Sequence, residues 1–126
     1  MIRHAQAELP NECCGLLAGV RDQDAWRVFA IHPLVNELES ATVYHSEPRS
    51  MFEASKAMRE AGHEILAVYH SHPTSEPIPS RTDLARQYIP GLMQVIIGLH
   101  GPTPTVRAWW LEETTFAEAA WTIVEL

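Results

Sequence analysis

Two short, largely apolar runs, Ile65–Tyr69 and Met93–Leu99, restrict the fold of this chain more than any other feature. Runs of this length without regular polar alternation are typical of strands that are covered on both faces of a sheet. Strands of this kind need other elements packed against each face. The two runs therefore predict the centre of a mixed sheet that is flanked by helices.

A hairpin is predicted ahead of the first run. Cys13–Val20 resembles a buried strand, Arg21–Asp24 suits a turn, and Ala25–Ile31 alternates as an antiparallel partner would. Because successive side chains of a strand point to opposite faces, Cys13 and Cys14 are expected on opposite faces, as small buried hydrophobic residues. As sequence neighbours they provide no disulfide framework, which fits a reducing compartment.

Three helices are expected. The clearest spans Pro48–Ala61, with a proline at its start and Gly62 as its stop. A second begins at Ser80, where Ser80-Arg81-Thr82-Asp83 matches a capping sequence, and ends near Tyr88, ahead of a proline. The opening stretch Ile2–Leu9 is expected to be the remnant of a helix.

Three further segments complete the predicted elements. A short strand is expected near Thr42–Tyr44, and another at Thr105–Leu111, with Trp109 and Trp110 on opposite faces. The segment Phe116–Glu125 is compatible with either a helix or a strand. Together the elements predict a mixed α/β (α+β) fold in which helices pack against one sheet.

Composition limits the classes of function. The chain has 126 residues, which suits a single domain over residues 1–126, and carries 9 Lys and Arg against 16 Asp and Glu. A formal charge of -7 without a basic cluster argues against a nucleic-acid partner. No apolar run is long enough to span a membrane, and no signal peptide is recognisable, so a soluble, cytoplasmic protein is expected. The oligomeric state stays open.

The strongest chemical signal is a pair of histidines at the end of the first apolar run. His70 and His72 are two residues apart, so the pleat of a strand directs both imidazoles to one face. Asp83 follows after a proline-rich loop whose restricted conformations favour its return to the histidines. Two imidazoles and one carboxylate can hold a zinc ion (Zn²⁺) and leave its fourth position open, as catalytic sites do.

Each of these residues also has a simpler interpretation. A lone histidine is more often a surface residue than a ligand, and Ser80 with Asp83 is by itself a helix cap. The conjunction of all these features favours a metal site, and capping is compatible with ligation because a helix N-terminus favours negative charge. A structural zinc site with a fourth protein ligand, such as His45, His63 or a cysteine, is the alternative.

The segment from His70 to Asp83 resembles the signature of the JAMM (JAB1/MPN/Mov34) metalloproteases, which is an upstream glutamate, then H-x-H-P, then S-x-x-D. Pro10-Asn11-Glu12-Cys13-Cys14-Gly15-Leu16-Leu17 is similar to the first motif of that family. The resemblance implies a JAB1/MPN-like fold, with layers like those of cytidine deaminases. It also implies zinc ligands at His70, His72 and Asp83, a general base at Glu12, and an oxyanion-stabilising serine at Ser80.

The same resemblance implies an activity. Members of the family hydrolyse a peptide or isopeptide bond after the C-terminal Gly-Gly of ubiquitin-like proteins, and small prokaryotic members act on sulfur-carrier proteins. Glu12 at the start of one strand and His70 at the end of another predict a site at one rim of the sheet, beside an edge strand. A catalytically inactive MPN-type scaffold is the alternative, although such relatives usually lack a ligand and none is missing here.

Overall fold

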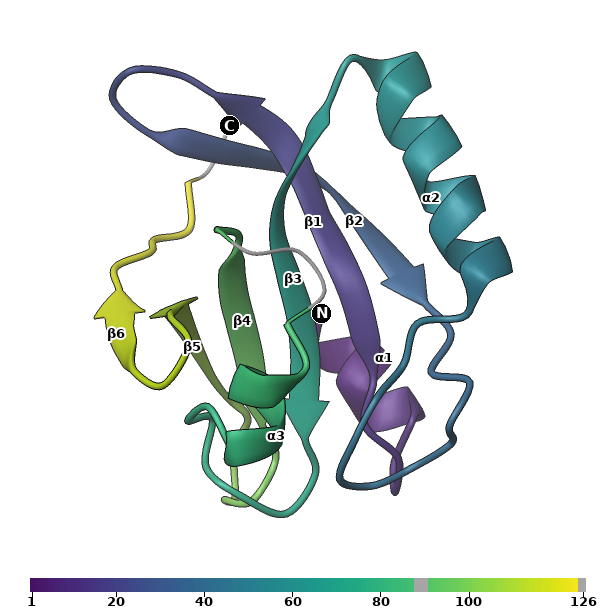
Figure 1. The fold of residues 1–126 in the computed structure, drawn as a ribbon, viewed down its shortest axis with the longest axis vertical. Coiled ribbons are helices and arrows are strands. Elements are labelled where there is room, and N and C mark those ends of the chain that lie inside the picture. Colours follow the sequence, from purple (N-terminus) through teal and green to yellow (C-terminus); the bar gives the residue numbers. More distant parts are fainter. Residues whose placement is uncertain (88–90, 125–126) are drawn as a thin grey trace.

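The two apolar runs lie side by side at the centre of a six-stranded sheet (Figure 1). The computed structural model describes residues 1–87 and 91–124. Within them the strand order across the sheet is β2-β1-β3-β4-β5-β6. The elements, in chain order, are α1 (Ile2–Ala7), β1 (Cys14–Arg21), β2 (Trp26–Leu34), α2 (Pro48–Ala61), β3 (Glu64–His72), α3 (Arg81–Ala85), β4 (Met93–Gly98), β5 (Thr105–Leu111) and β6 (Phe116–Ala119).

Strand directions make the sheet mixed, which confirms the predicted fold class. The central strands β3 and β4 run parallel, and they are joined by the crossover that contains α3. The pairs β2–β1, β1–β3, β4–β5 and β5–β6 are antiparallel. The first pair is the predicted hairpin, although β2 continues past Ile31 as far as Leu34.

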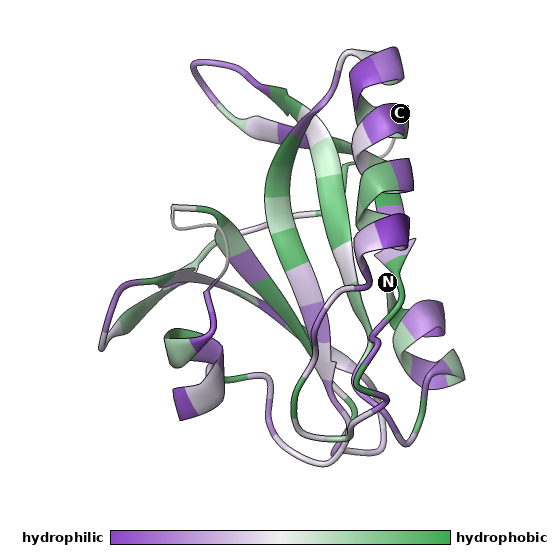
Figure 2. Cartoon of the chain, turned by 45° about the vertical axis from the view of Figure 1, so that its right-hand side comes forward, coloured by the Kyte–Doolittle hydropathy of each residue, from purple (hydrophilic) through white to green (hydrophobic). Residues whose placement is uncertain are grey.

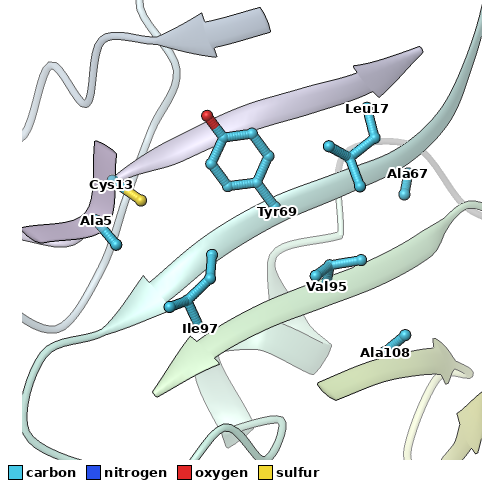
Figure 3. Close-up of a cluster of buried hydrophobic side chains, with 8 residues drawn as sticks. All are labelled: Ala5, Cys13, Leu17, Ala67, Tyr69, Val95, Ile97 and Ala108. Atoms are coloured by element: carbon cyan, nitrogen blue, oxygen red, sulfur yellow. The ribbon is translucent and has the colours of Figure 1, made fainter. Parts of the chain in front are cut away.

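The core has two parts because β1 is covered on both faces. Cys13 and Leu17 pack into a cluster that includes Ala5 of α1 (Figure 3). Cys14 and Leu16 point the other way, into a cluster under α2. The prediction that the two cysteines face opposite sides of the sheet, both buried, is therefore confirmed.

Helix α2 has the bounds that its sequence predicts. Proline opens it, and Gly62 ends it with a positive φ of 73°, a backbone conformation that a residue without Cβ adopts easily. Ala54 and Met58 are its buried side chains, and they pack on β1 and its neighbours. Figure 2 shows hydrophilic bands on this helix beside a largely hydrophobic sheet.

One predicted strand is wrong. The structure forms no strand at Thr42–Tyr44, where the backbone bonds to side chains instead of to a neighbouring strand. The N–H of Thr42 donates to Ser40 Oγ, and the carbonyl oxygen of Val43 accepts from Asn36 Nδ2. Ser and Asn side chains commonly compete with a sheet ladder in this way.

The remaining differences are at the ends of elements. Helix α3 ends at Ala85, because Arg86 leaves helical backbone geometry (φ -111°, ψ 36°), and Tyr88 lies outside the described residues. The final segment is a strand, β6, that ends at Ala119, and Glu125 is again outside the described residues. No helix of the described chain is long and apolar enough to cross a membrane.

Candidate active site

Sheet register creates the site. In the antiparallel pair β1–β3, Cys14 is the partner of His70, so the start of β1 lies against the end of β3. Glu12, two residues before Cys14, enters β1 from this same end of the sheet. This rim is the lower edge of the sheet in Figure 1, where α3 and the loop before it also lie.

The structure brings the three predicted ligands together. His70 Nε2 lies 3.2 Å from His72 Nε2 and 3.1 Å from Asp83 Oδ1, and His72 Nε2 lies 3.1 Å from Asp83 Oδ2. Tetrahedral zinc with bonds of ~2.0–2.1 Å would hold its ligand atoms about 3.3 Å apart. The two imidazole nitrogens are close to that spacing, and Asp83 turns a different oxygen to each of them, so the donor atoms of the three residues form one cluster that could hold an ion.

Neighbouring groups orient both imidazoles. His72 Nδ1 lies 2.8 Å from the carbonyl oxygen of Glu76, which can only accept, so Nδ1 carries a proton and Nε2 is the nitrogen that faces the cluster. The ring of Tyr44 stacks on that of His70, with centroids 4.9 Å apart and an interplanar angle of 29°. Ligation through His72 Nε2 would need the release of the proton that it donates to Asp83, while the Nδ1 proton keeps the ring in place.

Charge at the cluster favours a cation. Burial alone would raise the pKa of Asp83, but hydrogen bonds from His70 and His72 outweigh it and hold that pKa far below its usual range. Burial would likewise lower the pKa of His72, yet the hydrogen bond to Asp83 and the Glu76 carbonyl raise it. An ionised carboxylate between two imidazoles is a set of donor groups that suits a divalent metal ion.

The loop between β3 and α3 is fixed against the sheet. Gly98 of β4 makes this possible, because a Cβ there would lie 2.6 Å from Pro77 Cδ. Trp109 Nε1 donates a hydrogen bond of 2.9 Å to the carbonyl oxygen of Pro77. These contacts hold the chain that returns Asp83 to the histidines.

Ser80 caps α3 and lies beside the ligands. Its Oγ accepts from the N–H of Asp83 at 3.1 Å, and its own N–H donates to Asp83 Oδ2 at 2.9 Å, which completes a capping box. The cap uses the hydroxyl as an acceptor only. Its proton stays available to an oxygen in the open site.

Glu12 is buried next to this cluster, with 4% of its surface exposed. Burial, then repulsion from Asp83, raises the pKa of its carboxyl to about 8, while His72 acts in the opposite direction. Its Oε1 has no hydrogen-bond partner among the described residues. Glu12 Oε1 is thus a buried oxygen without a partner beside His70, His72 and Asp83. A metal ion with an associated water at these residues would supply the missing hydrogen bond.

Asn36 and Tyr44 belong to the site although their sequence context does not indicate it. Asn36 is buried, and its side chain donates to the carbonyl oxygen of Glu12 at 3.1 Å. A buried asparagine in a loop has no periodic signature, so only the folded structure reveals it. Within the described chain the group that could hold a metal ion consists of His70, His72 and Asp83, without His45, His63 or a cysteine.

Two characterised relatives share most of the chain. It is 37% identical over 110 residues to a desampylase of Haloferax volcanii, covering 86% of this chain and 77% of that protein. It is 32% identical over 102 residues to a CysO-cysteine peptidase of Mycobacterium tuberculosis, covering 81% and 68% respectively.

Solved structures agree on the fold. A protein from Desulfitobacterium hafniense superposes with a TM-score of 0.85 at 36% identity, over 94% of this chain and 82% of that one. A JAB1/MPN domain protein from Archaeoglobus fulgidus superposes with a TM-score of 0.58 at 17% identity, over 98% and 86%, which supports the fold alone. The sequence model of the family of prokaryotic homologs of the JAB domain matches residues 1–112. With its ligand cluster at the sheet rim, the chain belongs to this prokaryotic JAB family.

Proposed function

We propose that this protein is a zinc-dependent hydrolase that cleaves a peptide or isopeptide bond after the C-terminal Gly-Gly of a ubiquitin-like or sulfur-carrier protein. The observation that carries the proposal is the triangle of His70, His72 and Asp83 donor atoms with the buried carboxyl of Glu12 beside it. The residues 1–126 act as one domain in this proposal, and a cytoplasmic location stays a prediction.

Each residue has a defined task. When bound by His70, His72 and Asp83, zinc supplies a Lewis acid that polarises the scissile carbonyl and lowers the pKa of a coordinated water. Glu12 takes the proton from the attacking water and passes it to the leaving amine, for which a raised pKa is suited. The Ser80 hydroxyl donates to the oxygen of the tetrahedral intermediate.

Two alternatives have less support. A structural zinc site needs four protein ligands, and the group found among the described residues has three. An inactive scaffold does not require a buried acid next to a complete ligand set, and keeping Glu12 buried without a partner for Oε1 costs stability. An enzyme accounts for both features.

The substrate class rests on the relatives and on the rim geometry. The relatives are named for removing a group from a protein conjugate or from CysO. Strand β2 is one of the two edge strands of the sheet, and its last residue, Leu34, pairs with Cys14 at the rim that holds the site. An extended tail can add to such an edge by main-chain hydrogen bonds, and glycine permits close approach to the metal.

A matched pair of carrier-protein adducts tests the proposal. One adduct ends in Gly-Gly before the scissile bond and the other in Ala-Ala, and mass spectrometry identifies the products. We expect the zinc-loaded protein to cleave the glycine form, with the bond broken after the second glycine. Chelation and Asp83→Ala should both abolish cleavage, because each removes the metal or one of its three protein ligands.

Two results would contradict the proposal in different ways. Equal kcat/KM for both adducts would remove the Gly-Gly specificity and leave a zinc peptidase. Stoichiometric zinc in purified Asp83→Ala would remove the metal assignment itself.

A further inference from the structure

The main chain of Glu12 lies outside the sheet ladder. Strand β1 begins at Cys14, and both polar groups of the Glu12 backbone bond to the loop between β2 and α2 instead. Its N–H donates to the carbonyl oxygen of Ser40 at 2.8 Å, and its carbonyl oxygen accepts from Asn36 Nδ2 at 3.1 Å. The loop therefore sets the position from which the Glu12 side chain starts.

The side-chain amide of Asn36 is the centre of that loop. It is 8% exposed, and all its hydrogen-bonding capacity is used. Nδ2 donates to the carbonyl oxygens of Glu12 and Val43 at 3.1 and 3.2 Å. Oδ1 accepts from the N–H groups of Leu38 and His45 at 3.2 and 3.1 Å. An aspartate of the same size keeps the acceptors and loses both donors.

Backbone placement matters more for Glu12 than for most acids. Its Oε1 has no partner among the described residues, so no neighbouring side chain orients that oxygen. The adjacent residue is held from the other side, because the N–H of Cys13 donates to Ser71 Oγ at 2.8 Å. The main chain at Glu12 is thus held from two sides: by the bond from Cys13 to Ser71 in β3, and by the bond from Asn36 in the loop.

We infer that Asn36 is a positioning residue for the reaction: it holds the main chain of Glu12 so that the carboxyl faces the cluster of His70, His72 and Asp83. The inference rests on the proposed function, in which Glu12 is the general base. Among the described residues the side chain of Asn36 makes no hydrogen bond to His70, His72 or Asp83, and its direct link to the site is the carbonyl oxygen of Glu12. A displacement of the order of 1 Å is enough to cost a catalytic group much of its effect.

The test uses Asn36→Asp and Asn36→Ala in the zinc-loaded protein, with the Gly-Gly adduct as substrate. We expect kcat to fall about 10- to 100-fold in both variants, the usual effect of a group that supports a catalytic residue. KM and the zinc content should stay within about twofold of the unaltered protein, because the metal ligands keep their own supports. Circular dichroism and melting temperature verify that each variant is folded at the assay temperature.

The matched controls are Asn11→Asp and Asn11→Ala. Asn11 precedes Glu12 directly, and its side chain makes no hydrogen bond within the described residues. The controls reproduce the chemical change and the added charge next to the base without touching the loop. Their kcat should stay within about threefold of the unaltered protein, in line with an uninvolved surface change.

A double-mutant cycle separates positioning from general structural support. If Asn36 acts through Glu12, then Asn36→Asp should lose its effect in the Glu12→Gln background, whose residual turnover is followed over long incubations. An equal fold-loss in both backgrounds would overturn the inference. So would normal kcat in both Asn36 variants, or loss of fold in both, which would make the residue structural.

The same measurements distinguish this inference from the proposed function. Near-normal turnover in Glu12→Gln alone would remove the base and with it the proposed mechanism. Loss of turnover in Glu12→Gln with normal turnover in Asn36→Asp would leave the mechanism intact and reject only the role of Asn36.

Discussion

Two carboxyl groups of one buried cluster have pKa values that are shifted in opposite directions. Hydrogen bonds from two histidines keep the pKa of Asp83 far below its usual range, and burial raises the pKa of Glu12 to about 8. Divergent pKa values of neighbouring acids are typical of sites in which one group binds or stabilises charge and the other transfers protons. The environment, and not the residue type, assigns the two roles.

Replacing Glu12 by glutamine should preserve the metal and stop the reaction. Glutamine matches the acid in size but cannot accept a proton, so kcat should fall by about 10²- to 10⁴-fold, the usual contribution of a positioned acid or base. Turnover by mass spectrometry and zinc by elemental analysis measure the two effects. Near-normal turnover would exclude Glu12 from proton transfer.

The raised pKa of Glu12 also predicts a pH dependence of stability in the metal-free protein. A carboxyl whose folded pKa lies above its unfolded value contributes stability below about pH 4.5, and that contribution is lost as pH rises through about 8. Glu12→Gln should therefore raise the melting temperature of chelated protein more at pH 9 than at pH 5. An equal shift at both values would contradict the burial of an ionisable group there.

Substitutions at Ser80 should separate its two roles. Ser80→Ala removes both cap and hydroxyl, and kcat should fall by roughly 10²- to 10³-fold if the proton reaches the oxyanion. Ser80→Thr is the matched control, because threonine keeps a capping hydroxyl that still accepts from the N–H of Asp83. A lower melting temperature with unchanged kcat in Ser80→Ala would limit the residue to capping.

At the scale of elements, the loop between β3 and α3 positions Asp83. Two hydrogen bonds hold this loop, from the His72 ring to the Glu76 carbonyl and from the indole of Trp109 to the Pro77 carbonyl. The absence of a side chain at Gly98 lets Pro77 pack against β4. Helix α3 is too short to place its first turn by itself. The position of Asp83 therefore depends on Gly98 in β4 and Trp109 in β5.

Trp109→Phe tests that dependence. It keeps an aromatic ring in the core but leaves the buried carbonyl of Pro77 without its donor, which should cost about 1–3 kcal/mol. Zinc affinity should weaken in parallel, as chelator competition would measure. Trp110→Phe is the matched control, since the neighbouring ring is 37% exposed and makes no such bond among the described residues. Equal effects of the two substitutions would refute a specific role for the indole N–H.

The sequence predicts elements well where burial or capping determines them. Pro48 and Gly62 define α2, and the two apolar runs become adjacent central strands. The strand expected at Thr42–Tyr44 failed because Asn36 and Ser40 take the backbone bonds that a strand would use. Such side-chain contacts connect segments across a loop, and no local pattern encodes them.

The ligand positions were predictable for a different reason. His70 and His72 are fixed on one face by the two-residue period of a strand, and this holds whatever the register. The positions of Glu12 and Asn36 depend on strand pairing and loop closure, which a single sequence leaves undetermined. Glu12 is predicted only through a motif, and no sequence pattern indicates Asn36.

At the scale of the molecule, the proposed metal site predicts that metal binding and folding are linked. The three ligands come from β3 and α3, on both sides of the crossover, so a bound ion ties these elements together. At a free zinc concentration of ~1,000 Kd, the ion should add about 4 kcal/mol to the free energy of unfolding. Chelation should then lower the melting temperature by roughly 10 °C or more, given typical unfolding entropies for this size.

Scanning calorimetry with and without chelator measures this shift, and Asp83→Ala provides its control. That variant has lost a ligand, so its melting temperature should not respond to chelation. An equal response in both proteins would show that the chelator acts elsewhere.

The opposed, buried cysteines have a kinetic consequence. Burial raises the pKa of Cys13 to about 11 and that of Cys14 to about 12, so neither thiol reacts while β1 stays paired with β3. The main-chain N–H of Cys13 donates a hydrogen bond to Ser71 Oγ, and Ser71 lies between His70 and His72. A local opening of the sheet that exposes the Cys13 thiol therefore also breaks the contact between β1 and the two histidines' strand. Alkylation under native conditions therefore measures how often the metal site opens, and a bound ion should slow it in proportion to its occupancy.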